Sequence, residues 1–257
     1  MKNFVFTVDD NIRFLSELAK GGYCSIFEHP YLALYKRFHE RYGLNVQLNL
    51  FYECDGFSLS DMPEKYKSEF EAVSDWLKMS FHSRLENLHP YESSSYCEVL
   101  SDCNAVNREI VRFAGEDSLA KTTTIHYCRA TNEGCLALRD AGVSGLLGLY
   151  GTVSEPRLSY AINESEGRVI RSGENLTVCG ITHAAIDLII NTVARSDIAD
   201  KLSPLLDRQT VKIMIHEQYF YPDYPRYQPD FEEKLNAAFY ILTENGFKSA
   251  FFEKIIK

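Results

Sequence analysis

The sequence lacks a cysteine pattern that would indicate a disulfide-stabilised domain or a zinc knuckle. None of its cysteines falls in a C-x-x-C pair, and their number, seven, is odd. Free thiols in a reducing compartment are therefore the simpler interpretation. The cysteines stand at positions 24, 54, 97, 103, 128, 135 and 179.

Long apolar runs and an excess of basic charge are also missing. No run approaches the roughly 18 apolar residues of a membrane-spanning helix. The first ten residues hold only a short apolar run before two acids, without the longer apolar core and cleavage site of a signal peptide. Lys and Arg number 27 against 36 Asp and Glu, which gives a formal charge of −9. Because nucleic acids and anionic membranes attract basic surfaces, we expect a soluble, cytoplasmic protein that binds neither.

The 257 residues instead show alternating strand and helix patterns. Apolar strand-like runs, such as Phe4–Val8 and Val46–Phe51, alternate with helical spacing, as in Ile12–Lys20 and Pro30–Tyr42. Such repeated units, without a linker or internal repeat, predict one α/β domain over 1–257 with a largely parallel sheet. A closed or nearly closed barrel competes with an open doubly wound sheet at this length. No Gly-rich dinucleotide or Walker loop follows the first strand, which disfavours nucleotide binding.

The segment around 150–180 interrupts this alternation. Strands are expected at Arg157–Ile162, Arg168–Arg171 and Asn175–Val178, and they would form a β-hairpin insertion. Thr182 is then expected to cap a helix that runs to about Ala194.

Carboxylates and histidines directly follow the predicted strands. These strand-end residues are Asp9, Asp10, His82, His126, His216 and Glu217. Because the carboxyl ends of parallel strands converge on one face, we expect most of them to share one site. Carboxylate and imidazole together suit a divalent metal such as zinc, and also acid–base catalysis.

Two alternatives concern residues next to these histidines and acids. Successive strand residues point to opposite faces, so Asp9 and Asp10 are expected to split roles, or one of them caps the following helix. If the segment after His82 is helical, Glu86 and His89 lie on the same face as His82 and are further candidate ligands; otherwise it is a surface loop.

An aromatic segment follows His216. Residues 217–229 contain five aromatic side chains and three prolines. Aromatic rings such as Tyr219 and Tyr221 can stack on sugar rings, and the alternative is a rigid loop packed over the mouth of the barrel.

Several of these positions resemble motifs of the polysaccharide deacetylase family, which carries the NodB homology domain (carbohydrate esterase family 4). Thr7–Asn11 resembles its Thr-Phe-Asp-Asp-Gly motif, and His82-Ser83 followed by Pro90 resembles its His-Ser/Thr-x-x-His-Pro motif. Thr124–Thr131 is similar to the segment that carries the active-site arginine, and Ile213–His216 to the last motif. The order of the motifs agrees, so the chain resembles a divergent member of this family.

The resemblance implies a NodB-like distorted (β/α) barrel and a metal-dependent hydrolase that removes an acetyl group from an amino sugar or glycoconjugate. Asp9 would be the catalytic base, His216 the general acid, and Arg129 the residue that orients Asp9. Asp10 and His82 would bind the divalent metal, which we expect to be zinc.

The third metal ligand is where the sequence departs from the family. Glu86 occupies the position of the family's second histidine, and His89 lies three residues further on. Either Glu86 or His89 is the third ligand, or metal binding is degraded. His126 has no counterpart in the motifs and is an extra ligand or a donor to the substrate, and Glu217, Tyr219 and Tyr221 are expected to contact a carbohydrate.

Three functions remain open from the sequence. The first is the deacetylase, and the second is another metal-dependent amidohydrolase that acts on a small amide. The third is an inactive relative that binds carbohydrate. Assembly into a homo-oligomer is also left open.

Overall fold

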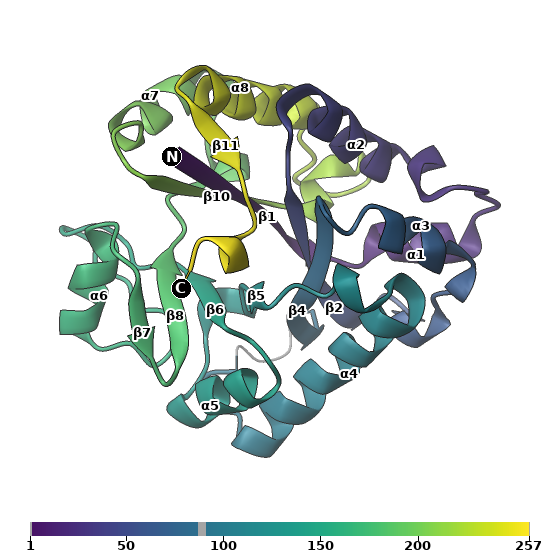
Figure 1. The fold of residues 1–257 in the computed structure, drawn as a ribbon, viewed down its shortest axis with the longest axis horizontal. Coiled ribbons are helices and arrows are strands. Elements are labelled where there is room, and N and C mark those ends of the chain that lie inside the picture. Colours follow the sequence, from purple (N-terminus) through teal and green to yellow (C-terminus); the bar gives the residue numbers. More distant parts are fainter. Residues whose placement is uncertain (1, 87–90, 257) are drawn as a thin grey trace.

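A computed structural model describes residues 2–86 and 91–256. Helices lie around the outside of two β-sheets (Figure 1). The strands are β1 (Lys2–Asn11), β2 (Val46–Cys54), β3 (Phe57–Ser58), β4 (Leu77–Leu85), β5 (Thr122–Thr123), β6 (Gly145–Gly148), β7 (Leu176–Val178), β8 (Ile181–Ala185), β9 (Leu188–Ile189), β10 (Thr210–His216) and β11 (Phe247–Ser249). The helices are α1 (Arg13–Lys20), α2 (Pro30–Tyr42), α3 (Lys67–Ala72), α4 (Tyr96–Ala114), α5 (Asn132–Asp140), α6 (Glu164–Arg171), α7 (Ile198–Leu202) and α8 (Phe231–Glu244).

The larger sheet is built around β1. Its order is β3-β2-β1-β10-β9, with β4 also paired to β2 and β11 also paired to β1. Every pairing is parallel except that of β2 with β3. Phe4 and Phe6 of β1 pack against Phe239 of α8, with ring centroids 5.9 and 5.0 Å apart. A central parallel strand is covered on both faces, which explains its nearly continuous apolar run.

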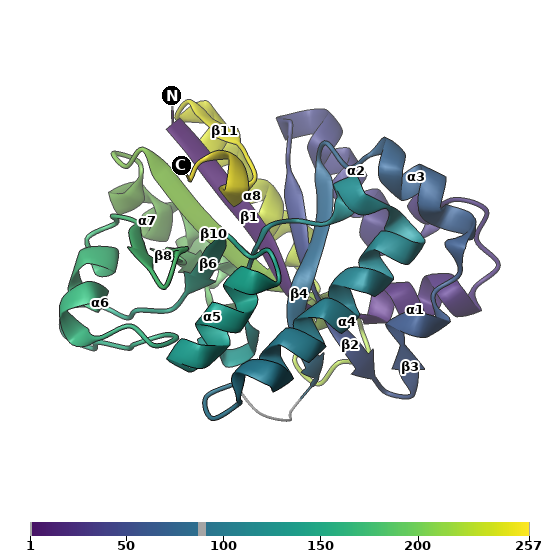
Figure 2. The ribbon, with the colours of Figure 1, turned by 60° about the horizontal axis from the view of Figure 1, so that its bottom comes forward.

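The smaller sheet has the order β5-β6-β8-β7, and only β7 runs antiparallel to its neighbour. Single backbone bonds connect the two sheets: Ala120 donates to Met79, at 2.8 Å, and Asp187 donates to Lys212, at 2.7 Å. Over residues 2–86 and 91–256, no ladder joins β4 to β5, so the strands form two separate sheets (Figure 2). The prediction of an α/β fold with a largely parallel sheet is confirmed.

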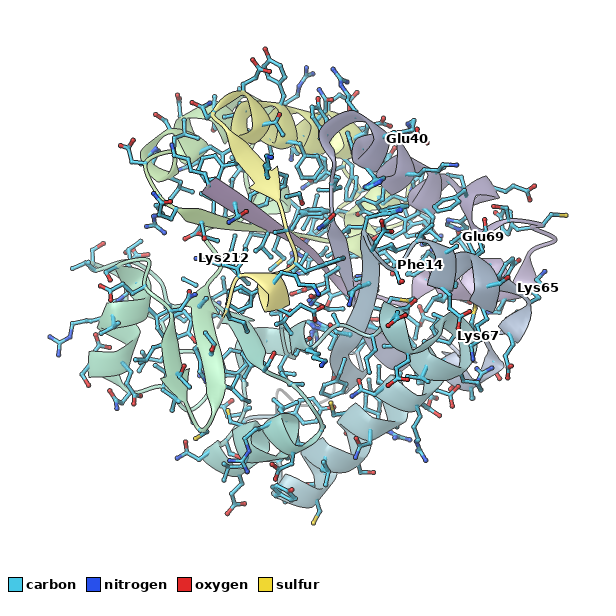
Figure 3. The ribbon with its side chains drawn as sticks, viewed as in Figure 1. Phe14, Glu40, Lys65, Lys67, Glu69 and Lys212 are labelled. Atoms are coloured by element: carbon cyan, nitrogen blue, oxygen red, sulfur yellow. The ribbon has the colours of Figure 1, made fainter. Side chains whose placement is uncertain are left out.

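A small apolar cluster fills part of the space between the sheets. It consists of Val5, Leu147, Ala184, Ile186, Met214 and Phe252. Beside it, Lys212 of β10 is buried between the sheets (Figure 3), with its ammonium 3.6 Å from the Asp187 carboxylate. Met214 of this cluster also lines the cavity at the carboxyl ends of the strands.

Three predicted elements are wrong. Arg157–Ile162, expected as a strand, is irregular chain that ends in a turn, because Tyr160 has a left-handed backbone, with a φ of +55°, that breaks an extended run. The helix expected from Thr182 to Ala194 is instead β8 and β9, followed by a short 3₁₀ turn. Its apolar residues are buried on both faces of a sheet, and such a run shows no strand alternation in the sequence. Arg168–Arg171 belongs to α6 rather than to a strand; Asn163 and Glu166 form a capping box at the start of that helix.

Other features of the chain agree with the sequence or stay open. All seven cysteines are free thiols. No helix in the described part of the chain combines the length and hydrophobicity that crossing a membrane requires. The single domain over 1–257 and the insertion around 150–180 stay predictions.

Candidate metal and catalytic site

The backbone turns sharply at the end of β1, between the two aspartates. Asp10 has a φ of +61°, and the register between β1 and β2 shifts between Val8 and Asn11. Left-handed backbone is uncommon for residues other than glycine, although Asp tolerates it better than most. The irregularity breaks strand alternation, so Asp9 and Asp10 both reach one cavity, of about 240 Å³. Their side chains therefore do not diverge as a regular strand would require.

Three donor atoms converge in this cavity. His82 Nε2 lies 3.0 Å from Asp10 Oδ1, and His126 Nδ1 lies 3.1 Å from His82 Nε2 and 3.3 Å from Asp10 Oδ1. Donors bound to a tetrahedral zinc at about 2.0–2.1 Å lie about 3.3 Å from one another. The spacing of these residues therefore fits a divalent cation.

The protonation of His82 supports the same conclusion. Its Nδ1 bonds the backbone carbonyl of Thr124, which can only accept, so Nδ1 carries the proton. In the neutral ring Nε2 then carries a lone pair that faces the carboxylate of Asp10. Only a proton or a metal ion between the two atoms relieves their electrostatic repulsion. A second-sphere carbonyl that fixes the ring in this way is typical of metal-binding histidines.

The electrostatics of the cluster favour a charged carboxylate. Burial alone would raise the pKa of Asp10, but hydrogen bonds from His126 and His82 hold that pKa well below its ordinary value. Burial likewise opposes the charged form of His82, while the carboxylates of Asp9 and Asp10 raise the pKa of this histidine. Asp10 is thus a carboxylate anion at neutral pH.

Gln218 completes the surroundings of Asp10. Its Nε2 donates to Asp10 Oδ2 at 2.7 Å, and this bond leaves Oδ1 to face the two histidines. No motif marks Gln218 in the sequence; its only signal is its place two residues after His216, in the turn that leaves β10.

Asp9 and His216 also line the cavity that holds Asp10, His82 and His126. Asp9 is fully buried, and burial raises its pKa, an effect that the nearby His82 and His216 partly offset. Asn49 donates from Nδ2 to Asp9 Oδ1 at 2.6 Å. His216 Nδ1 lies 2.9 Å from Asn191 Oδ1, an acceptor, so this nitrogen carries a proton and Nε2 is free to exchange one.

Of the two residues expected as alternative third ligands, the structure describes Glu86, which lies outside the histidine cluster. Glu86 accepts a hydrogen bond from the thiol of Cys54 at 2.9 Å. It lines a neighbouring cavity of about 540 Å³, which also contains Asp10, Arg13 and Lys20. Among the described residues, the group with metal-ligand spacing is Asp10, His82 and His126, without Glu86. His89 lies outside the described residues.

Arg129 points away from the cavity. Its guanidinium donates to the carbonyl of Leu158 at 3.4 Å, and it does not line the cavity that holds Asp9. The arginine at the mouth is Arg157, which is exposed and donates to the carbonyl of Tyr127 at 3.5 Å.

The residues expected to bind carbohydrate have other contacts. Glu217 is buried, and its carboxylate accepts hydrogen bonds from the backbone N–H groups of Ile12, Arg13 and Phe14, at 2.7, 3.0 and 2.7 Å. It therefore caps α1 and faces away from the cavity. Tyr221 is buried with its hydroxyl 3.2 Å from Glu217.

Tyr219 stays closer to the site. It is half-buried, with its ring 6.1 Å from that of His216 and 5.3 Å from that of Tyr224. Of the aromatic residues expected at a substrate, Tyr219 is the one that the fold leaves beside His216.

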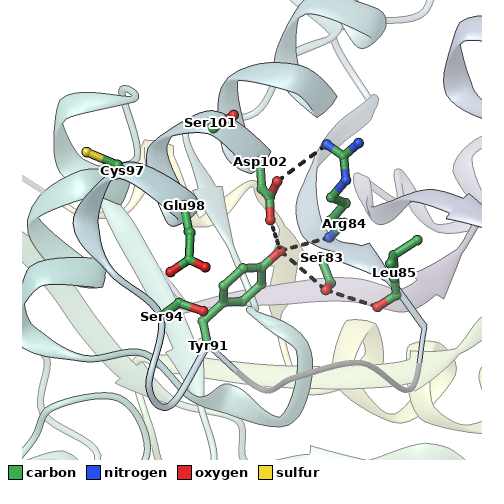
Figure 4. A pocket seen from close by; sticks show the side chains of 9 residues that line it. All are labelled: Ser83, Arg84, Leu85, Tyr91, Ser94, Cys97, Glu98, Ser101 and Asp102. Atoms are coloured by element: carbon green, nitrogen blue, oxygen red, sulfur yellow. Dashed lines mark hydrogen bonds and ion pairs between the residues drawn. The ribbon is translucent and has the colours of Figure 1, made fainter.

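A separate cavity lies outside β4, against α4 (Figure 4). The hydroxyl of Tyr91 accepts from the backbone N–H of Arg84 at 2.9 Å and donates to Asp102 at 3.1 Å. None of the three strand-end histidines lines this cavity. These hydrogen bonds hold Tyr91 against both β4 and α4, so a structural role accounts for the polar residues of this cavity.

No protein-family model matches the sequence, and no curated protein matches it significantly. Solved structures do resemble its fold. A 4-alpha-glucanotransferase from Thermococcus litoralis aligns with a TM-score of 0.63 and 14% identity over 98% of this chain. The chain spans only 40% of that protein's length.

Two structures of similar size align over nearly the whole of both chains. A family 4 acetyl xylan esterase from Clostridium thermocellum, in complex with cobalt, has a TM-score of 0.53 and 10% identity, over 99% of this chain and 90% of its own. A peptidoglycan N-acetylglucosamine deacetylase has a TM-score of 0.50 and 11% identity, over 99% and 87%. The predicted resemblance is confirmed at the level of the fold: this chain shares the NodB-like architecture of the family 4 polysaccharide deacetylases.

Proposed function

We propose that this chain is a metal-dependent hydrolase that removes an acetyl group from an amino sugar or glycoconjugate. One observation carries the proposal: Asp10, His82 and His126 have the spacing of metal ligands, and Asp9 and His216 share their cavity. A ligand set with an acid and a base beside it is the arrangement that metal-assisted hydrolysis needs. The substrate class is proposed from the activities of two similar structures, the acetyl xylan esterase and the peptidoglycan deacetylase.

Asp10, His82 and His126 would hold the metal. When bound, a divalent ion supplies Lewis acidity toward an acyl oxygen and makes water a better nucleophile at neutral pH. Two imidazole nitrogens and one carboxylate oxygen are a set that zinc accepts, so zinc is the ion we propose.

The chain's own residues would move the protons. Asp9, held by Asn49, accepts the proton of the attacking water. His216, whose Nδ1 proton is held by Asn191, gives a proton from Nε2 to the leaving nitrogen or oxygen. Tyr219 lies beside His216 and would contact the sugar.

The first test is the metal content of protein purified without chelator or an affinity-tag metal. About one equivalent of zinc, cobalt or a similar ion in the wild type, and a much lower content in Asp10→Ala, supports the site. Glu116→Ala, in which a carboxylate is removed far from the cavity, is the control. No metal even after excess zinc would contradict the proposal and favour an inactive carbohydrate-binding relative.

A substrate screen separates the two enzymatic functions. Acetylated amino sugars and their oligomers are compared with short aliphatic amides, and free acetate is measured. Release of acetate from the sugars supports the deacetylase, whereas hydrolysis of the amides alone would replace it with a small-amide hydrolase.

A further inference from the structure

Beneath the site, the space between the sheets holds a layer of buried polar side chains. Gln47 and Asn49 of β2, Ser80 of β4 and Thr122 of β5 are each at most 2% exposed. Buried polar groups are costly unless they are hydrogen-bonded, so a layer like this stays only where its bonds are made. The member of this layer that reaches the site is Asn49, which donates a hydrogen bond to Asp9.

The bonds of this layer fix which way the Asn49 amide points. Its Oδ1 accepts from Gln47 Nε2 at 2.8 Å and from Ser80 Oγ at 2.6 Å. Turning the amide over would place its N–H groups against these two donors and its oxygen against the Asp9 carboxylate. The nitrogen must therefore face Asp9.

Gln47 is held just as firmly. Its Oε1 accepts from Thr122 Oγ1 at 2.9 Å, and its Nε2 donates to the carbonyl of Thr122 at 2.8 Å. The direction of the Asn49 amide is thus set by strands on both sides of the gap between the sheets.

Within residues 2–86 and 91–256, Asn49 donates the side-chain hydrogen bond to Asp9, and no ion pair includes Asp9. Arg129, which was expected to orient it, is directed to Leu158. The hydrogen bond from Asn49 occupies Oδ1 and leaves Oδ2 for the cavity.

We propose that Asn49 is the positioning residue for Asp9: an uncharged amide, locked by Gln47 and Ser80, fixes the direction of the carboxylate. This inference rests on the proposed function in so far as Asp9 acts as the base. The geometry itself does not depend on a bound metal.

The kinetic test compares Asn49→Leu, which keeps the size of the side chain and removes both polar atoms, with Thr7→Val. Thr7 is on the same strand as Asp9, and its buried hydroxyl has no hydrogen-bond partner in the part of the chain that the structure describes, so Thr7→Val is a matched control. We expect kcat to fall about 10- to 100-fold in Asn49→Leu, the usual cost of losing an orienting partner, with KM and bound metal unchanged. Thr7→Val should keep the wild-type kcat.

A double-mutant cycle tests whether the layer acts through Asn49. Made in the otherwise wild-type chain, Ser80→Ala should lower kcat by a few-fold. Made together with Asn49→Leu, it should cause no further loss of kcat. If the two losses of kcat are fully additive, Ser80 does not act through Asn49, and this part of the proposal is overturned. If Asn49→Leu does not fold, Ser80→Ala and Gln47→Leu still report on the same orientation.

Crystal structures of wild type and Asn49→Leu give a readout that is independent of turnover. A turned or multiply oriented Asp9 carboxylate in the variant supports the proposal, and an unchanged carboxylate overturns it. If the wild type hydrolyses no acetylated compound, the proposed function fails, yet the orientation of Asp9 in the variant still decides the role of Asn49.

Discussion

Asp9 and His216 stand directly opposite each other on neighbouring parallel strands. They are register partners at the carboxyl ends of β1 and β10, so their side chains project from the same face. This pairing explains how a carboxylate and an imidazole 207 positions apart in the chain come to share one cavity. Asp10, one residue on, then turns by its left-handed backbone toward His82 and His126.

Replacing His126, the proposed third ligand, tests the geometry of the candidate metal site. His126→Ala should lower zinc affinity at least 100-fold, because it removes one of three converging donors, whereas Glu86→Ala should keep wild-type affinity. Isothermal titration of the metal-free protein with zinc measures both. A loss of affinity in Glu86→Ala, with none in His126→Ala, would contradict the assignment.

Asp9→Asn separates binding from catalysis. The amide keeps the shape of the side chain but cannot accept the proton, so we expect one equivalent of metal and a loss of kcat of about 10²- to 10⁴-fold. Metal analysis and steady-state kinetics on an acetylated amino sugar are the measurements. Wild-type turnover in this variant would exclude Asp9 as the base.

Asn191→Leu should act on catalysis through His216. Without the acceptor at Nδ1, the imidazole loses its fixed tautomer and direction, so kcat should fall about 10-fold while metal content stays at the wild-type value. Asn245→Leu, at the exposed end of α8, serves as the control. Equal kinetics in the two variants would argue against a role for Asn191.

Glu217→Ala should destabilise the fold. The substitution leaves three backbone N–H groups at the start of α1 without their acceptor, which costs about 2–4 kcal/mol of unfolding free energy. Urea unfolding measures the change. Glu233→Ala, an exposed position in α8, should stay within about 0.5 kcal/mol of the wild type.

His183 should make the protein sensitive to acid. Its ring is buried, neither nitrogen is paired to another described side chain, and burial lowers its pKa to about 4. The unfolded chain binds a proton near pH 6.5, so between pH 6.5 and 4 protonation favours unfolding and stability falls by up to about 3 kcal/mol. Above pH 6.5 this contribution is fully present.

His183→Leu should reduce that dependence. The difference in unfolding free energy between pH 7 and pH 4.5 is expected to be smaller in the variant than in the wild type. Denaturant unfolding at the two pH values measures it. An unchanged difference would show that other groups dominate the acid sensitivity.

Local sequence patterns predicted most of the elements that carry the site. The helix expected over Pro30–Tyr42 is α2, with the same limits, because Pro30 starts it and Gly43, with a φ of +63°, ends it. The strands that carry His82 and His216 were recognised from their apolar residues at 77, 79 and 81 and at 211 and 213–215. The run after Thr182 failed because burial on both faces gives strands and helices similar patterns.

The sequence by itself determined that carboxylates and histidines stand at the ends of parallel strands, because strand character and chain direction are local properties. Only the tertiary structure decided which of them meet. His126 rather than Glu86 joins Asp10 and His82, and Asn49 and Gln218 hold the two aspartates. Those contacts join residues 40 and 208 positions apart, and they depend on strand order and on one irregular residue in β1, which no local pattern records.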